Sequence, residues 1–120
     1  MTYYARDGQR LTYEEAVRPE VWDMASRRVG DDTVGGYQVS TVHIVLDHSH
    51  GGPTPIIFET MLFGDGEYDQ WYERYSTEAE ALAGHARMVE SLRTTGAPPV
   101  DDDELPAEDP AADRIGWAER

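Results

Sequence analysis

Three of the four histidines lie within eight residues of one another, and with nearby carboxylates they are the groups best suited to chemistry. His43 stands in a run of β-forming residues, and His48 and His50 follow in a polar loop that begins at Asp47. Imidazole and carboxylate groups are ligands for zinc and other transition metals. With Glu59 they would form the site of a metal-dependent hydrolase. The alternative is a polar loop in which Asp47 caps the turn and the histidines are solvated.

His43 and Glu59 are also candidates for an ion pair between neighbouring strands, which would fix the register of the strands or bind a ligand. Tyr72 and Arg74, in a later aromatic run, would extend this patch into a site for a nucleotide or another small ligand. The chain contains neither Gly-x-Ser-x-Gly nor a glycine-rich phosphate loop. We therefore predict no catalytic residue and no cofactor, and we favour a protein that is not an enzyme.

Two β-forming runs, residues 37–46 and 56–63, must position these side chains, and residues 47–55 join them. With Leu46 opposite Ile56, the alternation of side chains predicts a hairpin with one more apolar face. In this register the predicted neighbours are Ile44 with Phe58, Val42 with Thr60, and His43 with Glu59. A slip of one residue would turn every side chain to the other face.

Helix signals flank this pair of strands. Thr12 and Glu15 form a capping-box pattern, and a second helix from Pro19 to about Arg28 carries Trp22 as the expected anchor to the sheet. The pattern Thr77-Glu78-Ala79-Glu80 starts a longer helix over residues 78–93, with Gly96 as its stop. Its expected apolar stripe, which would face the sheet, consists of Leu82, Ala86, Val89 and Leu92.

Two further strands complete the expected fold. Thr33-Val34, before the turn at Gly35-Gly36, predicts a short edge strand, and residues 68–75 predict an aromatic strand. The fold class is thus α+β: an antiparallel sheet of three to four strands, a C-terminal helix packed on one face and short N-terminal helices. Residues 1–96 form this single domain, and residues 97–120 form an acidic tail rich in proline and alanine, in which Trp117 is a candidate contact for a partner.

Composition restricts the function. The chain has 120 residues, no cysteine, and 24 acidic residues against ten basic ones, all arginine, for a net charge of −14. The missing cysteines exclude a disulfide scaffold, and the negative charge argues against direct binding of nucleic acid. A strongly negative surface suits a basic partner protein or mimicry of DNA, and the alternative is that the acidity simply keeps a small protein soluble. No stretch reaches the length of a membrane span, so we expect a cytoplasmic protein. The oligomeric state stays open.

The runs Val39–His48 and Ile57–Phe63, followed by Arg74–Glu78 and by Gly84-His85, resemble small uncharacterised acidic proteins encoded by phages of actinobacteria. The resemblance covers residues 35 to 93 and implies a phage or prophage origin, with the bacterial host cytoplasm as the location. The leading hypothesis is therefore a non-enzymatic interaction protein that binds a host or phage protein. The alternatives are a small-ligand (nucleotide) binding protein and the metal-dependent hydrolase.

Overall fold

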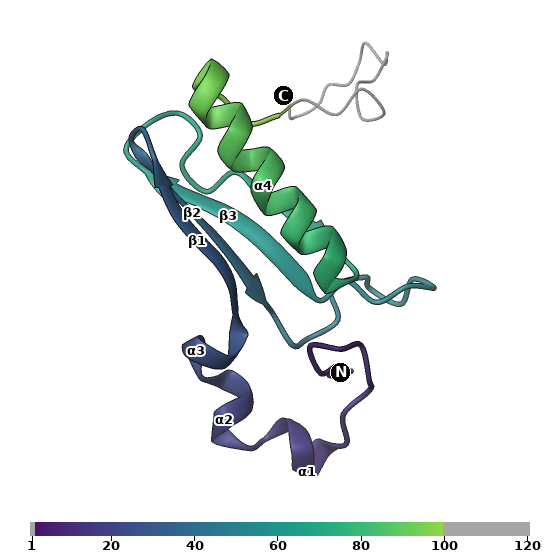
Figure 1. Ribbon diagram of the computed structural model, residues 1–120. Helices are drawn as coiled ribbons and strands as arrows, with labels where there is room; N and C mark the ends of the chain where they lie inside the picture. Colours follow the sequence, from purple (N-terminus) through teal and green to yellow (C-terminus); the bar gives the residue numbers. More distant parts are fainter. Residues whose placement is uncertain (1, 100–120) are drawn as a thin grey trace.

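The computed structural model describes residues 2–99 and has an α+β fold (Figure 1). A four-stranded antiparallel sheet has the strand order β1-β2-β3-β4. Its strands are β1 (Arg28–Val34), β2 (Tyr37–His43), β3 (Phe58–Gly64) and β4 (Tyr72–Tyr75). Three one-turn helices precede the sheet, namely α1 (Tyr13–Ala16), α2 (Pro19–Trp22) and α3 (Met24–Arg27), and the long helix α4 (Glu78–Thr95) follows it. The predicted fold class is confirmed.

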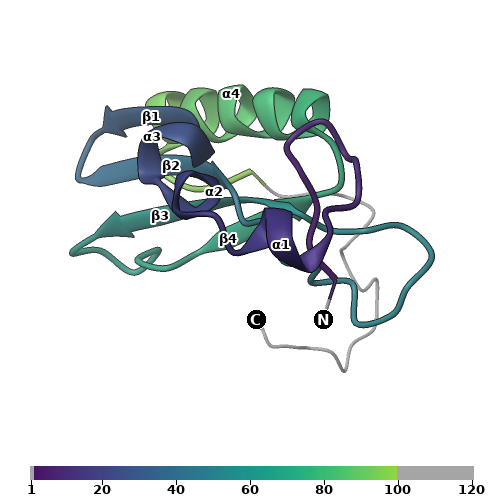
Figure 2. The same ribbon diagram turned by 90° about the horizontal axis from the view of Figure 1, so that it is seen from below.

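Helix α4 lies across one face of the sheet, and among residues 2–99 Figure 2 shows no helix on the opposite face. Both predicted helix starts form complete capping boxes, in which Thr12 pairs with Glu15 and Thr77 with Glu80. Gly96 ends α4 in the left-handed conformation, with φ of 77°. No helix within residues 2–99 is both long and apolar enough to cross a membrane.

The register between β2 and β3 differs from the predicted one by one residue. Val42 pairs with Glu59, and His43 pairs with Phe58. The observed register continues past His43, because the Ile44 N–H donates to the Ile57 carbonyl; Val45, with φ of 67° in the left-handed region, is buried like Val39, Thr41 and His43. The more apolar face of the predicted hairpin, which includes Val42, therefore points away from α4, and Val39, Thr41 and His43 point toward it.

The buried stripe of α4 is also rotated from the predicted one. Val89 and Leu92 are buried as expected, but Leu82 and Ala86 are exposed. The residues buried in their place are Ala81, Gly84, His85 and Met88. A search for apolar periodicity does not find this stripe, because Gly84 and His85 are not counted as apolar residues.

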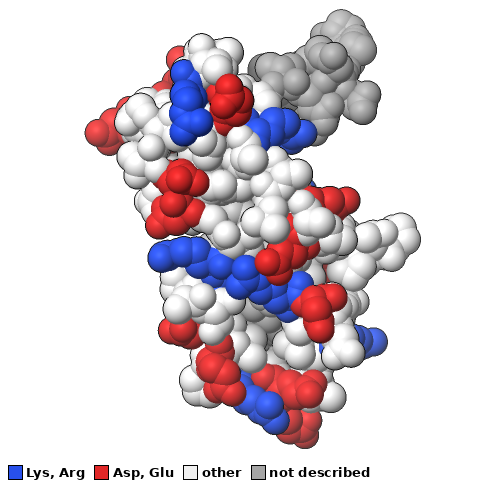
Figure 3. Space-filling model, viewed as in Figure 1, with Lys and Arg blue, Asp and Glu red and all other residues white. Residues whose placement is uncertain are grey.

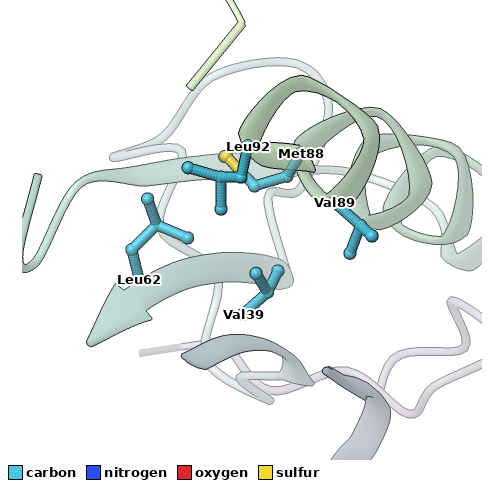
Figure 4. Close-up of a cluster of buried hydrophobic side chains, with 5 residues drawn as sticks. All are labelled: Val39, Leu62, Met88, Val89 and Leu92. Atoms are coloured by element: carbon cyan, nitrogen blue, oxygen red, sulfur yellow. The ribbon is translucent and has the colours of Figure 1, made fainter. Parts of the chain in front are cut away.

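The core between α4 and the sheet has two apolar clusters. The larger consists of Val39, Leu62, Met88, Val89 and Leu92 (Figure 4), and the smaller of Ile57, Phe58 and Ala81. Between them, along both the strands and the helix, lie the polar side chains of Thr41, Thr60 and His85, all of which are buried. The centre of the interface is therefore polar.

Three smaller expectations were wrong. Strand β1 begins at Arg28, which shortens the expected helix over residues 19–28 and splits it into α2 and α3. Strand β4 begins only at Tyr72, because the backbone of residues 64–70 turns before it. Trp22 does not anchor the sheet: its indole N–H donates to the Ala16 carbonyl, and its ring packs edge-on against Tyr3. Residues 100–120, which include most of the predicted tail and Trp117, lie outside the described residues.

Candidate interaction surface

The sheet face that α4 leaves uncovered carries the best candidate site. We call it the open face and define it by the outward side chains of β2, β3 and β4: Val42, Glu59, Met61, Phe63, Tyr72 and Arg74. The register places Glu59 beside both Val42 and Arg74, and Met61 beside Tyr72. Phe63 is 44% exposed and Tyr72 is 52% exposed. Aromatic and arginine side chains are enriched where proteins bind proteins.

Three of the predicted site residues meet on this face. Arg74 Nε donates to Glu59 Oε2 at 2.9 Å, and the Arg74 guanidinium stacks on the Tyr72 ring, 4.6 Å from its centroid. The stacking places the Tyr72 ring against the guanidinium, and the ion pair balances the charge of the cation. The three side chains together carry little net charge.

Grooves border the open face at β4, which is an edge strand. One, of about 360 Å³, is lined in part by Trp71, Tyr72, Arg74 and Pro99, and an adjoining one of about 490 Å³ runs toward Ser76. Arg87 of α4 lines both grooves and donates to Glu73 Oε1 at 2.9 Å. Since each arginine faces a glutamate, these grooves offer a phosphate group little attraction.

His43 lies on the opposite side of the sheet from Glu59, so the predicted pair does not form. Its Nε2 lies 2.9 Å from the Tyr4 carbonyl oxygen, and its ring packs against Phe58. Burial lowers the pKa of His43, and the nearby Arg27 and Arg6 lower it further, against the opposing effect of the Tyr4 carbonyl. His43 is thus a neutral side chain that ties the N-terminal segment to β2.

The predicted metal ligands do not converge either. Asp47 accepts hydrogen bonds from the backbone N–H groups of Ser49 and Ile56 and from the Ser49 hydroxyl. The two backbone donors lower the pKa of Asp47. His48 Nδ1 lies 2.9 Å from the Leu46 carbonyl oxygen, and His50 is exposed. Within residues 2–99, no three His, Asp or Glu side chains are grouped so as to hold a metal ion. Asp47 therefore stabilises the turn of the loop, which was the alternative to a metal site.

One constellation was missed in the sequence. His85 Nε2 lies 2.7 Å from Asp32 Oδ2, and its Nδ1 lies 2.7 Å from the Thr41 hydroxyl. The sequence signal was there, because His85 stands four residues after Ala81 and three before Met88, on the buried side of α4. Hydrolases use a similar order of carboxylate, imidazole and hydroxyl. Here the Thr41 hydroxyl is completely buried, so no substrate reaches it and the arrangement cannot act as a nucleophilic site.

No protein family, curated protein or solved structure matches the chain. Function therefore has to be inferred from the residues themselves. Among the residues described, the open face combines exposed aromatic side chains with an ion pair, whereas His43, His48 and His85 contact other parts of the fold.

Proposed function

We propose that this is a non-enzymatic interaction protein whose open face binds a basic protein. The observation that carries the proposal is the sheet face that no other part of residues 2–99 covers, with Phe63 and Tyr72 on either side of Met61. A monomeric soluble protein seldom leaves a contiguous apolar surface on a sheet without a use for it. The resemblance described above makes a host or phage protein the partner of choice.

The charge of the partner follows from the rim of this face. Asp31 projects on the same side of the sheet, next to Gln38, and Asp65 and Glu67 lie in the turn after β3. Residues 1–99 hold 16 of the 24 acidic residues and eight of the ten arginines, which leaves a net charge of −8. Figure 3 shows the opposite side of the molecule, which α4 covers, and there acidic and basic side chains lie interspersed. The net negative charge of residues 1–99 would steer a basic partner to the protein, and the partner would be held less tightly at high salt.

A nucleotide is the weaker candidate for this surface. Tyr72 and Arg74 do lie together, as that alternative required, but His43 is on the far side of the sheet. Glu59 and Glu73 stand directly beside the two arginines of the grooves. Phosphate oxygens would face these carboxylates, and the cost of that contact favours a protein ligand.

Matched substitutions test the proposal. Tyr72→Asp alters the open face, and Leu82→Asp is its control, because Leu82 is 51% exposed on α4 and makes the same change in charge elsewhere. Immobilised wild type and both variants are presented to an actinobacterial lysate, and any captured protein is purified and titrated by calorimetry. We expect a basic protein that binds wild type and Leu82→Asp alike, and at least tenfold more weakly to Tyr72→Asp, since a central aromatic contact is worth about 2 kcal/mol or more.

Equal binding to the two variants would reject the open face as the interface. Failure to recover a protein that binds wild type in the calorimeter would reject the interaction itself. Thermal-shift measurements with nucleotides separate the alternative, because a ligand at a hundredfold its Kd adds about 2.7 kcal/mol of stability.

A further inference from the structure

The polar centre of the core is one continuous chain of hydrogen-bonding groups. Beyond Asp32, His85 and Thr41, the Thr41 hydroxyl contacts the Thr60 hydroxyl, which lies 3.2 Å from the hydroxyl of Tyr75. The Tyr75 hydroxyl lies 3.0 Å from Glu73 Oε1. The chain runs through β1, α4, β2, β3 and β4 in turn, so it joins every strand of the sheet to the helix.

The fold makes room for this chain at two glycines. A Cβ atom on Gly30 would lie 2.8 Å from the His85 ring, and one on Gly84 would overlap the ring and hydroxyl of Tyr75. Both His85 and Tyr75 are thus packed directly against backbone. The chain's geometry is fixed by this packing, and its groups have little freedom to move apart.

Counting hydrogens along the chain reveals a mismatch. It has five contacts between its six groups: Asp32 with His85, His85 with Thr41, Thr41 with Thr60, Thr60 with Tyr75, and Tyr75 with Glu73. Each hydroxyl brings one hydrogen, a neutral imidazole brings one, and an ionised carboxylate brings none. With neutral His85, the five contacts share only four hydrogens.

The missing hydrogen can be assigned to one of the five contacts. Nε2 of His85 must carry a hydrogen because it faces the Asp32 carboxylate, so in the neutral ring Nδ1 accepts from Thr41. Thr60 then donates to Thr41, and Tyr75 donates to Thr60. No hydrogen remains between the Tyr75 and Glu73 oxygens, although they lie 3.0 Å apart. Arg87 donates to the same Glu73 oxygen at 2.9 Å.

We propose that this chain is a proton-binding site, in which folded protein holds His85 as the doubly protonated imidazolium. In that form the ring donates to both Asp32 and Thr41, and every hydroxyl turns to donate toward Glu73, so all five contacts have a hydrogen. The added charge faces Asp32 at one end of the chain and is balanced there. Burial raises the pKa of Tyr75, which keeps its hydroxyl protonated as the chain requires.

The surroundings of His85 are consistent with a single added proton. The carboxylates of the chain, Asp32 on β1 and Glu73 on β4, stand at its two ends. On the same side of β2, two residues from Thr41, His43 is kept neutral by burial. Arg87 of α4 is directed at Glu73 at the far end.

Nitrogen-15 NMR of the histidine rings in the full chain at neutral pH tests the proposal. In wild type we expect hydrogens on both ring nitrogens of His85, and exposed His50 serves as the internal reference. A His85 ring with a bare Nδ1 at this pH would overturn the proposal.

Two substitutions remove the mismatch without touching His85. In Tyr75→Phe three contacts remain, and neutral His85, Thr41 and Thr60 supply a hydrogen for each. In Thr60→Val the contact between Tyr75 and Glu73 is separated from those of His85, and every remaining contact has a hydrogen. We expect His85 to become neutral in both variants, with Nδ1 accepting from Thr41. Thr60→Ser keeps the hydroxyl and should keep the imidazolium, and Tyr13→Phe, an exposed tyrosine outside the chain, should change nothing.

If wild-type His85 is doubly protonated but stays so in both Tyr75→Phe and Thr60→Val, Asp32 alone is the cause and the chain is not the site. A purely structural role for the hydroxyls would lower stability in these variants and leave the ring nitrogens unchanged. The test does not depend on the proposed partner, because it needs no ligand.

Discussion

Polar side chains occupy positions in this core that apolar ones would normally fill. Thr41 and Thr60 are fully buried, and burying a hydroxyl without a partner costs about 1 to 3 kcal/mol. Thr41 contacts Thr60 and His85, and Thr60 contacts Thr41 and Tyr75. The contacts offset the desolvation and link the strands to α4 at one defined position.

His43 gives the protein a pH-dependent weakness. Burial lowers its pKa in the folded state, so as pH falls through the ordinary range of histidine, near 6.5, the unfolded chain takes up the proton first. Stability contributed by neutral His43 is present at higher pH and is lost as pH falls. His43→Gln should remove this loss, at a cost at neutral pH of roughly 1 to 2 kcal/mol for the lost packing on Phe58.

Urea unfolding at a series of values between about pH 5 and 8 measures this effect. His50→Gln is the control, because His50 is exposed. A His43→Gln variant whose stability declines with acid as steeply as wild type would show that another group is responsible.

At the scale of elements, α4 packs on the sheet through close approaches of backbone to side chain at two glycines, as well as through its apolar residues. Gly84 lets the helix backbone meet the Tyr75 ring of β4, and Gly30 lets β1 meet His85. The two apolar clusters lie on either side of these contacts. A helix with a larger residue at position 84 would have to move away from β4.

Gly84→Ala tests this packing. Alanine favours helix over glycine by about 1 kcal/mol, so an open site would gain stability. Here we expect a net loss of about 1 to 3 kcal/mol, because the new methyl group overlaps the Tyr75 side chain. Chemical denaturation measures the change. Gly36→Ala is the control, since a Cβ there meets nothing within 4 Å; equal effects at the two positions would contradict the close approach.

Residues 2–99 form two layers, in which α4 covers one face of the sheet and no helix of these residues covers the other, and the protein carries a large negative charge. Carboxylates outnumber arginines along both the described domain and residues 100–120. Repulsion among them opposes the compact state, and salt screens it. The same screening would weaken the binding of a basic partner. Added salt should therefore stabilise the free protein and weaken the complex.

Raising NaCl from about 20 to about 200 mM should therefore stabilise the free protein. We expect a gain of about 1 kcal/mol, which is about 4 to 8 °C in Tm for a domain of this size. Circular dichroism melts at matched concentrations of NaCl and KCl measure it, and equal shifts in the two salts separate screening from binding of a particular ion. A Tm that falls with salt would mean that ion pairs such as Arg6 with Glu78 outweigh the repulsion.

Local signals were sufficient for much of the fold. The capping boxes at Thr12 and Thr77, the glycine stop at Gly96 and the turn at Gly35 each depend on residues close in the chain, and all are present in the structure. The site could be predicted only in part. Tyr72, Arg74 and Glu59 do meet. His43 and Asp47 instead form hydrogen bonds with the backbone, which the spacing of residues in the sequence does not indicate.

The amino-acid sequence by itself determined the α+β class, the helix ends and the negative charge, because these follow from near neighbours and composition. Only the tertiary structure decided which face of the sheet α4 covers. Alternation has a period of two and both faces of residues 37–46 carry apolar side chains, so the pattern is compatible with either choice. Burial of Thr41 became favourable only when α4 brought His85 into reach, and that contact spans 44 residues of chain.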